Sequence, residues 1–340
     1  MRICYFTKLN GTDLFRVLEY LHNDVKALRE LGHEVVLSSN PFRLPRDVDL
    51  YFAFFHIWGF FALPYKVLFG KPLVVAGFPE AMFPPDVKLR RPRDFVYEVM
   101  ERICIRHATV SIASSEHEKE FMLAVGGKDV KKVYLAVDTE LYRPDPANSR
   151  KPKQILSLFS FTPANNRRKC LEEILAAARI VHGRDPDVTF LLSGGFATEG
   201  MERHYREKTR DLGLSGVLEF TGRISPERKL TLLRESAVFL HPTRYEGFGL
   251  AIAEAMSCAL PVVASPEGSV PEILGDCGYL CDGRDPEDIA RVTLHVLSHP
   301  GEAREIAARA RERVMGNYPP EGRKDGIRQI LDRVMTAGTP

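Results

Sequence analysis

The sequence has almost no excess of charge of either sign and few cysteines. Its 47 basic and 45 acidic side chains give a formal net charge of +2 over 340 residues, so nothing favours nucleic acid as the main partner. Of the six cysteines only Cys277 and Cys281 lie close together, and no second pair stands near them at zinc-site spacing. We therefore expect reduced, mostly buried thiols in a cytoplasmic protein.

Long hydrophobic runs are also missing. No apolar stretch reaches the roughly 18–20 residues that span a bilayer, and the apolar start, residues 1–7, is too short for a signal-peptide core. The longest apolar run, residues 50–64, is interrupted by a histidine, a glycine and a proline, which favours a buried strand leading into a helix. Peripheral membrane contact stays open, because this run is followed by a basic cluster of Lys88, Arg90, Arg91 and Arg93.

What the sequence does contain is an alternation of strand-like and helical patterns. With 44% hydrophobic and 27% charged residues, the chain is too apolar to be disordered, and its length suggests two domains. Strands are expected at 1–7, 33–38, 49–54, 72–76, 109–113, 132–136, 155–161, 189–193, 217–221, 238–241 and 261–264. Helices are expected at 14–31, 167–182, 229–234 and 250–258, and over most of 285–335. Strands separated by helices predict parallel sheets with right-handed crossovers.

These patterns predict an α/β protein of two Rossmann-like, doubly wound domains that face a cleft. A polar segment with three prolines, residues 143–152, marks the linker. We place the first domain at 1–146 and the second at 147–317. The remaining residues, 318–340, are expected to form a helix that packs back on the first domain.

The most informative stretch is residues 238–256, where a strand ends, a glycine-rich turn follows and a helix begins near Leu250. Gly247 and Gly249 allow the backbone to approach a ligand closely, and the first turn of the helix offers unpaired N–H groups. Together these features predict an anion site, most naturally for phosphate.

Two carboxylates, Glu246 and Glu254, accompany this turn. They would repel a phosphate unless they bind something neutral, and sugar and ribose hydroxyls are neutral donors that suit a carboxylate acceptor. A nucleotide sugar supplies ribose, diphosphate and hexose together. The alternative is that Glu254 interacts only with the helix dipole and that Glu246 is a surface loop residue.

A basic run, Arg167-Arg168-Lys169, gives a second signal. If Asn166 is the N-cap of the following helix, these three cations stand in its first turn, where they oppose the helix dipole. This predicts a bound anion that supplies the missing negative charge. The alternative is that all three side chains point into solvent.

These residues also carry a resemblance to a known family. The stretch from Glu246 to Met256, with residues 261–265 and 271–273, is similar to the donor-site signature of family 4 retaining glycosyltransferases (glycosyltransferase group 1), which have the GT-B fold. Residues 113–116, 137–144 and 167–169 resemble further segments of this family, so the resemblance extends over nearly the whole chain.

The resemblance implies that the domain at 1–146 binds the acceptor and that the domain at 147–317 binds the nucleotide-sugar donor. It also implies roles for individual residues. Glu246 would contact the donor hexose, Glu254 the ribose hydroxyls, and Lys169 the diphosphate leaving group, so Glu246 and Lys169 are the candidate catalytic residues. The other candidate donor-binding residues are Gly247, Phe248, Gly249, Leu250, Arg167, Arg168 and Gly194.

Some positions depart from the family pattern. Residues 161–163 stand where a phosphate-binding arginine is expected, which leaves Arg167 and Arg168 as its candidate replacements. The loop at Asn10 and Gly11 has one glycine where relatives often have two. Many members carry an acceptor-facing histidine where this chain has Gly77, so His56, Asn10 and Gly11 are the acceptor-side candidates, with a core role as the alternative for His56.

The predicted function is the transfer of a sugar from a UDP-, GDP- or ADP-sugar to a hydroxyl, with the anomeric configuration retained and without a metal or other cofactor. The acceptor would be a sugar, a lipid-linked compound or another small molecule. A sugar-nucleotide epimerase on the same fold and an inactive nucleotide-sugar-binding protein are the alternatives. A dinucleotide-dependent oxidoreductase is disfavoured, because no Gly-x-Gly-x-x-Gly follows a strand.

Overall fold

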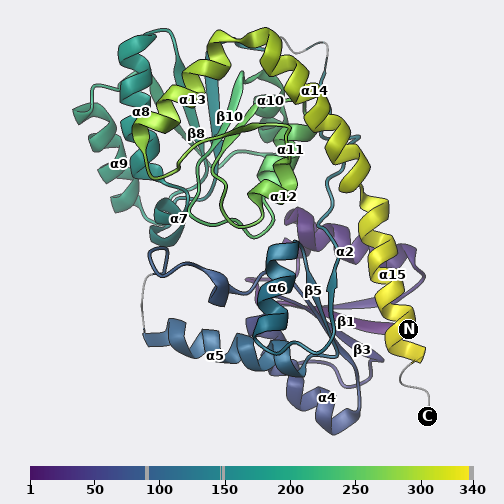
Figure 1. The fold of residues 1–340 in the computed structure, drawn as a ribbon. Coiled ribbons are helices and arrows are strands. Elements are labelled where there is room, and N and C mark those ends of the chain that lie inside the picture. Colours follow the sequence, from purple (N-terminus) through teal and green to yellow (C-terminus); the bar gives the residue numbers. More distant parts are fainter. Residues whose placement is uncertain (89–91, 146, 148–149, 337–340) are drawn as a thin grey trace. The chain divides into compact units, whose positions relative to one another are not determined.

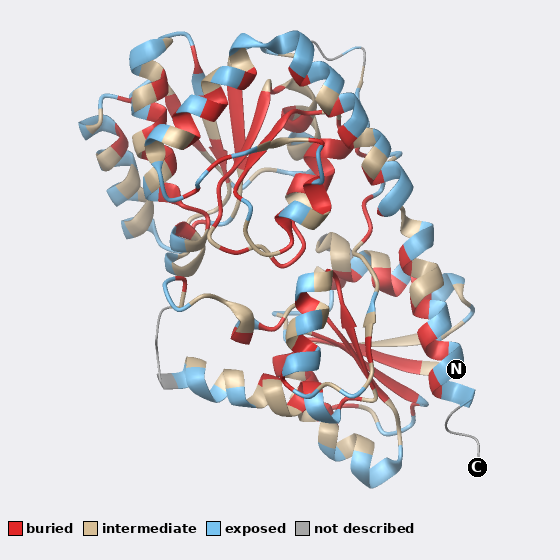
Figure 2. Ribbon diagram, viewed as in Figure 1, coloured by how far each residue is buried: buried red, intermediate tan, exposed pale blue. Residues whose placement is uncertain are grey.

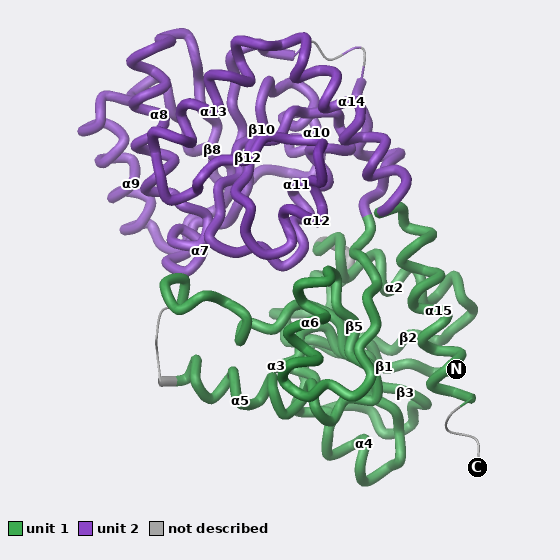
Figure 3. Tube along the Cα trace, viewed as in Figure 1, with its two compact units in different colours: residues 1–136, 318–340 green, residues 137–317 purple. Residues whose placement is uncertain are grey.

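The computed structural model describes residues 1–88, 92–145, 147 and 150–336 (Figure 1). Arg90 and Arg91 of the basic cluster and part of the expected linker lie outside these residues. The chain forms two compact units, Met1–Ala136 with Tyr318–Pro340, and Val137–Asn317 (Figure 3). The division thus falls ten residues before the position at which we expected it.

The first unit is built on a six-stranded parallel sheet with the order β2-β1-β3-β4-β5-β6. Its strands are β1 (Arg2–Phe6), β2 (Glu34–Ser38), β3 (Leu50–Phe54), β4 (Leu73–Ala76), β5 (Val110–Ala113) and β6 (Val130–Lys132). Both faces are covered, because successive β1 residues enter different clusters: Ile3 and Tyr5 pack on one side, Cys4 and Phe6 on the other. This is the burial expected of a doubly wound sheet.

Helices α2 and α15 pack together on one face of this sheet, where Leu28 and Ile327 share a cluster with Ile3. The helices of the unit are α1 (Leu14–Val17), α2 (Glu19–Glu30), α3 (His56–Gly59), η1 (Phe60–Ala62), α4 (Leu63–Phe69), η2 (Glu80–Met82), α5 (Pro92–His107), α6 (Glu116–Ala124) and α15 (Pro320–Thr336). A buried ion pair joins the two packed helices: the Arg323 guanidinium donates two hydrogen bonds, of 2.8 and 2.9 Å, to the Asp24 carboxylate.

The second unit contains another six-stranded parallel sheet, in the order β12-β11-β10-β7-β8-β9. Its strands are β7 (Gln154–Leu158), β8 (Thr189–Ser193), β9 (Leu218–Gly222), β10 (Val238–His241), β11 (Val262–Ala264) and β12 (Tyr279–Leu280). From β7 the chain adds β8 and β9 on one side and then β10, β11 and β12 on the other. The order therefore reverses between β7 and β10, and such switch points are where ligands bind in open α/β sheets.

The helices of the second unit cover a sheet whose strands are largely buried (Figure 2). They are α7 (Pro163–Arg168), α8 (Leu171–Arg184), α9 (Glu199–Asp211), α10 (Pro226–Glu235), α11 (Leu250–Ser257), α12 (Val270–Leu274), α13 (Pro286–Ser298) and α14 (Pro300–Asn317). Helices α8 and α13 pack on each other over one face.

The prediction of two doubly wound α/β units is confirmed, but several expected boundaries are wrong. The helix expected at 14–31 is interrupted at Leu18, whose backbone is extended (φ −83°, ψ 107°). The strand expected at 132–136 is instead β6, which ends at Lys132. Among the residues that the structure describes, no helix is both long and apolar enough to cross a bilayer.

Candidate donor site at the β7–β10 switch point

The candidate site lies where two neighbouring strands of the second sheet end. The loop and short helix after β7 carry Arg168 and Lys169, and the turn after β10 carries Glu246 and leads into α11. Because β7 and β10 are parallel neighbours, their carboxyl ends meet at one edge. A hydrogen bond of 2.8 Å from the Arg244 N–H to the Arg168 carbonyl joins the two segments directly.

The basic run is not in the first turn of a long helix, so that prediction is wrong. The short helix α7 begins earlier, because Thr162 is its N-cap, accepting a hydrogen bond from the Asn165 N–H, and Pro163 occupies its first turn. Arg167 and Arg168 consequently stand in the last turn of α7, where cations complement the helix dipole. The helix dipole therefore gives no reason to expect a bound anion at this run.

Contacts of the basic run form a buried cluster around the Glu246 carboxylate. Lys169 Nζ forms an ion pair with Glu246 Oε2 and lies 2.6 Å from His241 Nε2. His241 Nε2 is in turn 2.9 Å from Glu246 Oε2, and Arg168 Nη1 is 3.6 Å from Glu246 Oε1. With the Lys169 side chain only 4% exposed and that of Glu246 13% exposed, the cluster is shielded from water.

The surroundings shift the pKa of each member of the cluster. Burial and the neighbouring Arg168 lower the pKa of Lys169 to about 8. Burial and Lys169 lower the pKa of His241 to about 4. Burial alone would raise the pKa of Glu246, but Lys169 and His241 hold it well below its usual range. At pH 7 the cluster therefore combines cationic Arg168 and Lys169, neutral His241 and anionic Glu246, with one positive charge in excess.

The second glutamate, Glu254, lies in α11 and is buried, with its side chain only 2% exposed. Lys229 Nζ, from α10, donates a hydrogen bond of 2.7 Å to Glu254 Oε1 and another of 3.0 Å to the Tyr142 hydroxyl. Lys229 thus links the Glu254 carboxylate to Tyr142, which lies 87 residues before Lys229 in the sequence.

Sequence reasoning missed His241 and Lys229 as site residues. His241 did carry a signal, since it is the polar last residue of an otherwise apolar buried strand. Lys229 had none, because its role depends on the packing of α10 beside α11, which one sequence does not reveal.

Two of the predicted glycines have a backbone reason to be glycine. Gly249 is the N-cap of α11 and adopts a left-handed conformation (φ 89°). At the end of β8, a Cβ on Gly194 would lie 1.9 Å from the carbonyl oxygen of Phe159. Gly194 therefore lets the loop after β7 pack against β8. Of the remaining candidates, Gly247 and Phe248 are buried, Leu250 is half-buried and Arg167 is exposed.

A family model described as "Glycosyl transferases group 1" matches residues 138–313, just over half of the chain. The chain belongs to this glycosyltransferase family. The match includes all of the switch-point residues described above, so the predicted family is confirmed.

Curated relatives agree with the family. The chain is 28% identical over 235 residues to "MMP alpha-(1->4)-mannosyltransferase" of Mycolicibacterium hassiacum, covering 67% of this chain and 54% of that protein. It is 26% identical over 249 residues to "D-inositol 3-phosphate glycosyltransferase" of Rhodococcus jostii, covering 69% of this chain and 55% of that protein. The chain thus spans about half the length of the curated relatives it matches.

Solved structures show the same fold. Sucrose-phosphate synthase from Thermosynechococcus elongatus superposes with a TM-score of 0.81 at 18% identity, covering 99% of this chain and 100% of that one. Anabaena HepE, solved in complex with UDP and glucose, superposes with a TM-score of 0.76 at 18% identity, covering 98% of this chain and 100% of that one. These matches identify the fold of this group 1 family member as GT-B-like.

The acceptor-side candidates of this glycosyltransferase-family chain lie at the corresponding switch point of the first unit, where the strand order reverses between β1 and β3. Asn10 and Gly11 are exposed in the loop after β1. His56 follows β3 after one residue, Phe55, and begins α3, where it is completely buried. Burial lowers the pKa of its imidazole to about 4, so His56 is neutral at pH 7.

Within the part of the chain that the structure describes, no group of three or more His, Cys, Asp or Glu side chains is arranged to hold a metal ion. All six cysteines are buried free thiols.

Proposed function

We propose that this chain transfers a sugar from a nucleotide diphosphate sugar to a hydroxyl group, with retention of the anomeric configuration. The observation that carries the proposal is the grouping of Arg168 and Lys169 with Glu246 at the switch point, beside the start of α11. Cations and helix N–H groups suit a diphosphate, whereas carboxylates suit sugar hydroxyls. One binding edge thus offers both kinds of group that a nucleotide sugar needs.

Lys169 and Arg168 are the proposed diphosphate ligands. Arg168 is better placed than Arg167 to replace the arginine that residues 161–163 lack, since its guanidinium lies beside Glu246 while Arg167 is exposed. In the unliganded chain Lys169 is paired with Glu246. An incoming diphosphate therefore competes with this carboxylate for Lys169, and it leaves Glu246 able to accept hydrogen bonds from the hexose.

Glu254 is the proposed acceptor for the ribose hydroxyls. Lys229 bonds one carboxylate oxygen, and an ionised carboxylate accepts several hydrogen bonds, so the ribose and Lys229 can share the group. Glu254 is buried and paired with Lys229, and hydrogen bonds to a charged carboxylate are stronger than those to a neutral acceptor.

In the proposed reaction, the bond between the anomeric carbon and the diphosphate oxygen breaks while the acceptor oxygen bonds to the same carbon. Negative charge grows on the leaving diphosphate, where Lys169, Arg168 and the N–H groups at the start of α11 stabilise it. The acceptor proton passes to an oxygen of the leaving phosphate. These protein groups supply the positive charge, so the scheme needs no metal ion.

The acceptor is proposed to meet the loops after β1 and β3, near Asn10, Gly11 and His56. The names of curated relatives specify polyol acceptors, D-inositol 3-phosphate in one case and phosphatidyl-myo-inositol in another. We extend to this chain only the shared chemistry, a ring hydroxyl on a soluble or lipid-linked molecule. Catalysis in the cytoplasm, with peripheral membrane contact for a lipid-linked acceptor, is part of the same proposal.

A thermal-shift screen against UDP, GDP, ADP and their sugars tests the proposal first, because a bound ligand raises the melting temperature. The donor that binds is then incubated with inositol phosphates and simple sugars, and both nucleoside diphosphate and product are measured. We expect acceptor-dependent release of the diphosphate and an unchanged anomeric configuration in the product. Release of free nucleotide without an acceptor, or binding with no turnover, would contradict the proposal.

Matched variants assign the activity to the site. Glu246→Gln should abolish most turnover because it removes the charge that contacts the hexose. Glu219→Gln, at an exposed position of β9, should leave turnover unchanged. Equal activity of the two variants would remove Glu246 from the mechanism.

A further inference from the structure

A cavity lies at the edge of the second unit's sheet opposite the candidate donor site. Its volume is about 650 Å³, within the range of roughly 300–1,000 Å³ that is typical of small-molecule sites. Lys153, Ala237 and Pro261 line it, and these residues stand at or just before the starts of β7, β10 and β11. The cavity is thus at the amino ends of the strands, whereas the candidate donor site is at their carboxyl ends.

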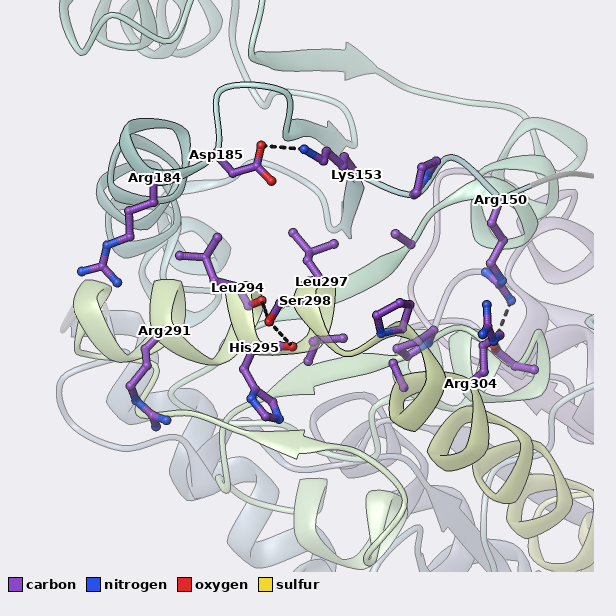
Figure 4. Close-up of a pocket in the computed structure, with 17 residues that line it drawn as sticks. Arg150, Lys153, Arg184, Asp185, Arg291, Leu294, His295, Leu297, Ser298 and Arg304 are labelled. Carbon is purple, nitrogen blue, oxygen red and sulfur yellow. Dashed lines mark hydrogen bonds and ion pairs between the residues drawn. The ribbon is translucent and has the colours of Figure 1, made fainter.

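One end of this cavity carries two arginines without carboxylate partners (Figure 4). Arg150 donates hydrogen bonds of 2.8 Å to three carbonyl oxygens, those of Ser236, Cys258 and Ala259. Arg304 makes no hydrogen bond or ion pair with any other residue that the structure describes. Burial lowers the pKa of Arg150, since desolvation disfavours its charged form.

The other basic groups of the lining are already neutralised. Lys153 Nζ is 2.8 Å from Asp185 Oδ1, Arg184 Nη2 is 3.5 Å from Glu287 Oε2, and Arg291 Nη2 is 2.6 Å from Asp288 Oδ1. The electrostatic attraction for an anion in the cavity is therefore strongest at the end formed by Arg150 and Arg304, because neither arginine is paired with a carboxylate.

The wall between these charged groups is apolar. Leu294 and Leu297 of α13 point into the cavity (Figure 4), and Val296, Pro261, Pro300 and Ala303 complete the apolar surface. A ligand that fills this space must therefore be apolar over most of its body and negatively charged at one end.

We propose that this cavity binds a small organic anion, with its charged group at Arg150 and Arg304 and its apolar body against α13. The site is separate from the candidate donor site and does not depend on the proposed function. Arg150 also contacts the carbonyls of Cys258 and Ala259, directly after α11. An anion bound there thus meets the guanidinium that holds the end of the helix carrying Glu254.

Fluorescence titration of the full chain with anilinonaphthalene sulfonate, an anionic aromatic probe, tests this site. Arg304 is exposed, so Arg304→Glu should fold normally while weakening probe binding roughly tenfold, the factor that 1.4 kcal/mol gives. Arg309→Glu is the matched control, since this exposed arginine of α14 does not line the cavity. Its affinity for the probe should equal that of the unmodified chain.

Two further measurements distinguish the contribution of the probe's charge from that of the cavity's shape. Phenylnaphthylamine, an uncharged analogue, should bind the unmodified chain and Arg304→Glu equally. Ser298→Trp, which puts a large ring at the exposed end of α13 on the cavity wall, should lose binding of both probes. Equal binding of the anionic probe to the unmodified chain, Arg304→Glu and Ser298→Trp would overturn the proposal.

Discussion

Raising the pH from 7 to 9 is expected to weaken the binding of a nucleoside diphosphate about tenfold through the deprotonation of Lys169. Its pKa of about 8 implies that about nine-tenths of the unliganded molecules carry the charge at pH 7 and about one-tenth at pH 9. A bound diphosphate raises this pKa, because an opposite charge favours the protonated amine. Binding above pH 8 must therefore take up a proton, and affinity falls with each further pH unit.

The stability of the unliganded chain is expected to depend on pH in the opposite direction. Burial makes the folded-state pKa of Lys169 lower than the ordinary value of 10.5, so protonated Lys169 disfavours the folded state. Its contribution to the free energy of unfolding should therefore become more favourable as the pH rises from about 8 towards 10.5. Donor affinity should therefore fall over the pH range in which the destabilising contribution of Lys169 is lost.

Calorimetric titration at several pH values, in buffers of different ionisation enthalpy, measures both the affinity and the proton uptake. Lys169→Arg is the matched control, since a guanidinium keeps its charge throughout this range. Ionisation of the nucleotide base would weaken nucleotide binding to both proteins equally. An affinity of the unmodified chain that stays constant to pH 9, or an equal loss in Lys169→Arg, would refute the role of Lys169.

Three further substitutions follow from the structure. Glu254→Gln should weaken nucleotide binding by about 10- to 100-fold, as expected for losing hydrogen bonds to a charged group, and unchanged affinity by calorimetry would exclude its ribose role. Arg323→Met should destabilise the first unit by about 3–5 kcal/mol, because Asp24 remains buried without its ionic partner. Thermal unfolding should then show a melting temperature about 10 °C lower. A shift of less than about 2 °C would contradict this prediction. Gly249→Ala should lower the free energy of unfolding by about 1–2 kcal/mol, since residues with a Cβ disfavour the left-handed conformation. Denaturant unfolding measures this loss, and an unchanged free energy of unfolding would contradict the prediction.

Strands with an apolar centre were the most predictable part of the fold. The expected strands at 238–241 and 189–193 coincide with β10 and β8, because short apolar runs rich in Val, Leu and Phe are typical of strands in a covered sheet. Short or polar strands were not predictable. β12 has two residues, and β6 contains two lysines, so neither carries a periodic signal.

The candidate site was predictable where its features are local in sequence. The Gly-rich turn and the start of α11 at Leu250 are the structure expected from the sequence. The basic run was placed in the wrong helix, because the N-cap of α7 is Thr162, four residues before the Asn166 cap that we expected. Contacts between distant residues, such as that of Lys229 with Glu254, arise only from the packing of separate helices.

A crystal structure of the chain with the nucleoside diphosphate that the screen selects would show whether the β7–β10 edge binds the diphosphate of a nucleotide sugar. We predict phosphate oxygens within hydrogen-bond distance of Lys169 Nζ and the N–H groups at the start of α11, with the ribose on Glu254. A nucleotide bound elsewhere, with Lys169 still paired to Glu246, would rule out this binding site.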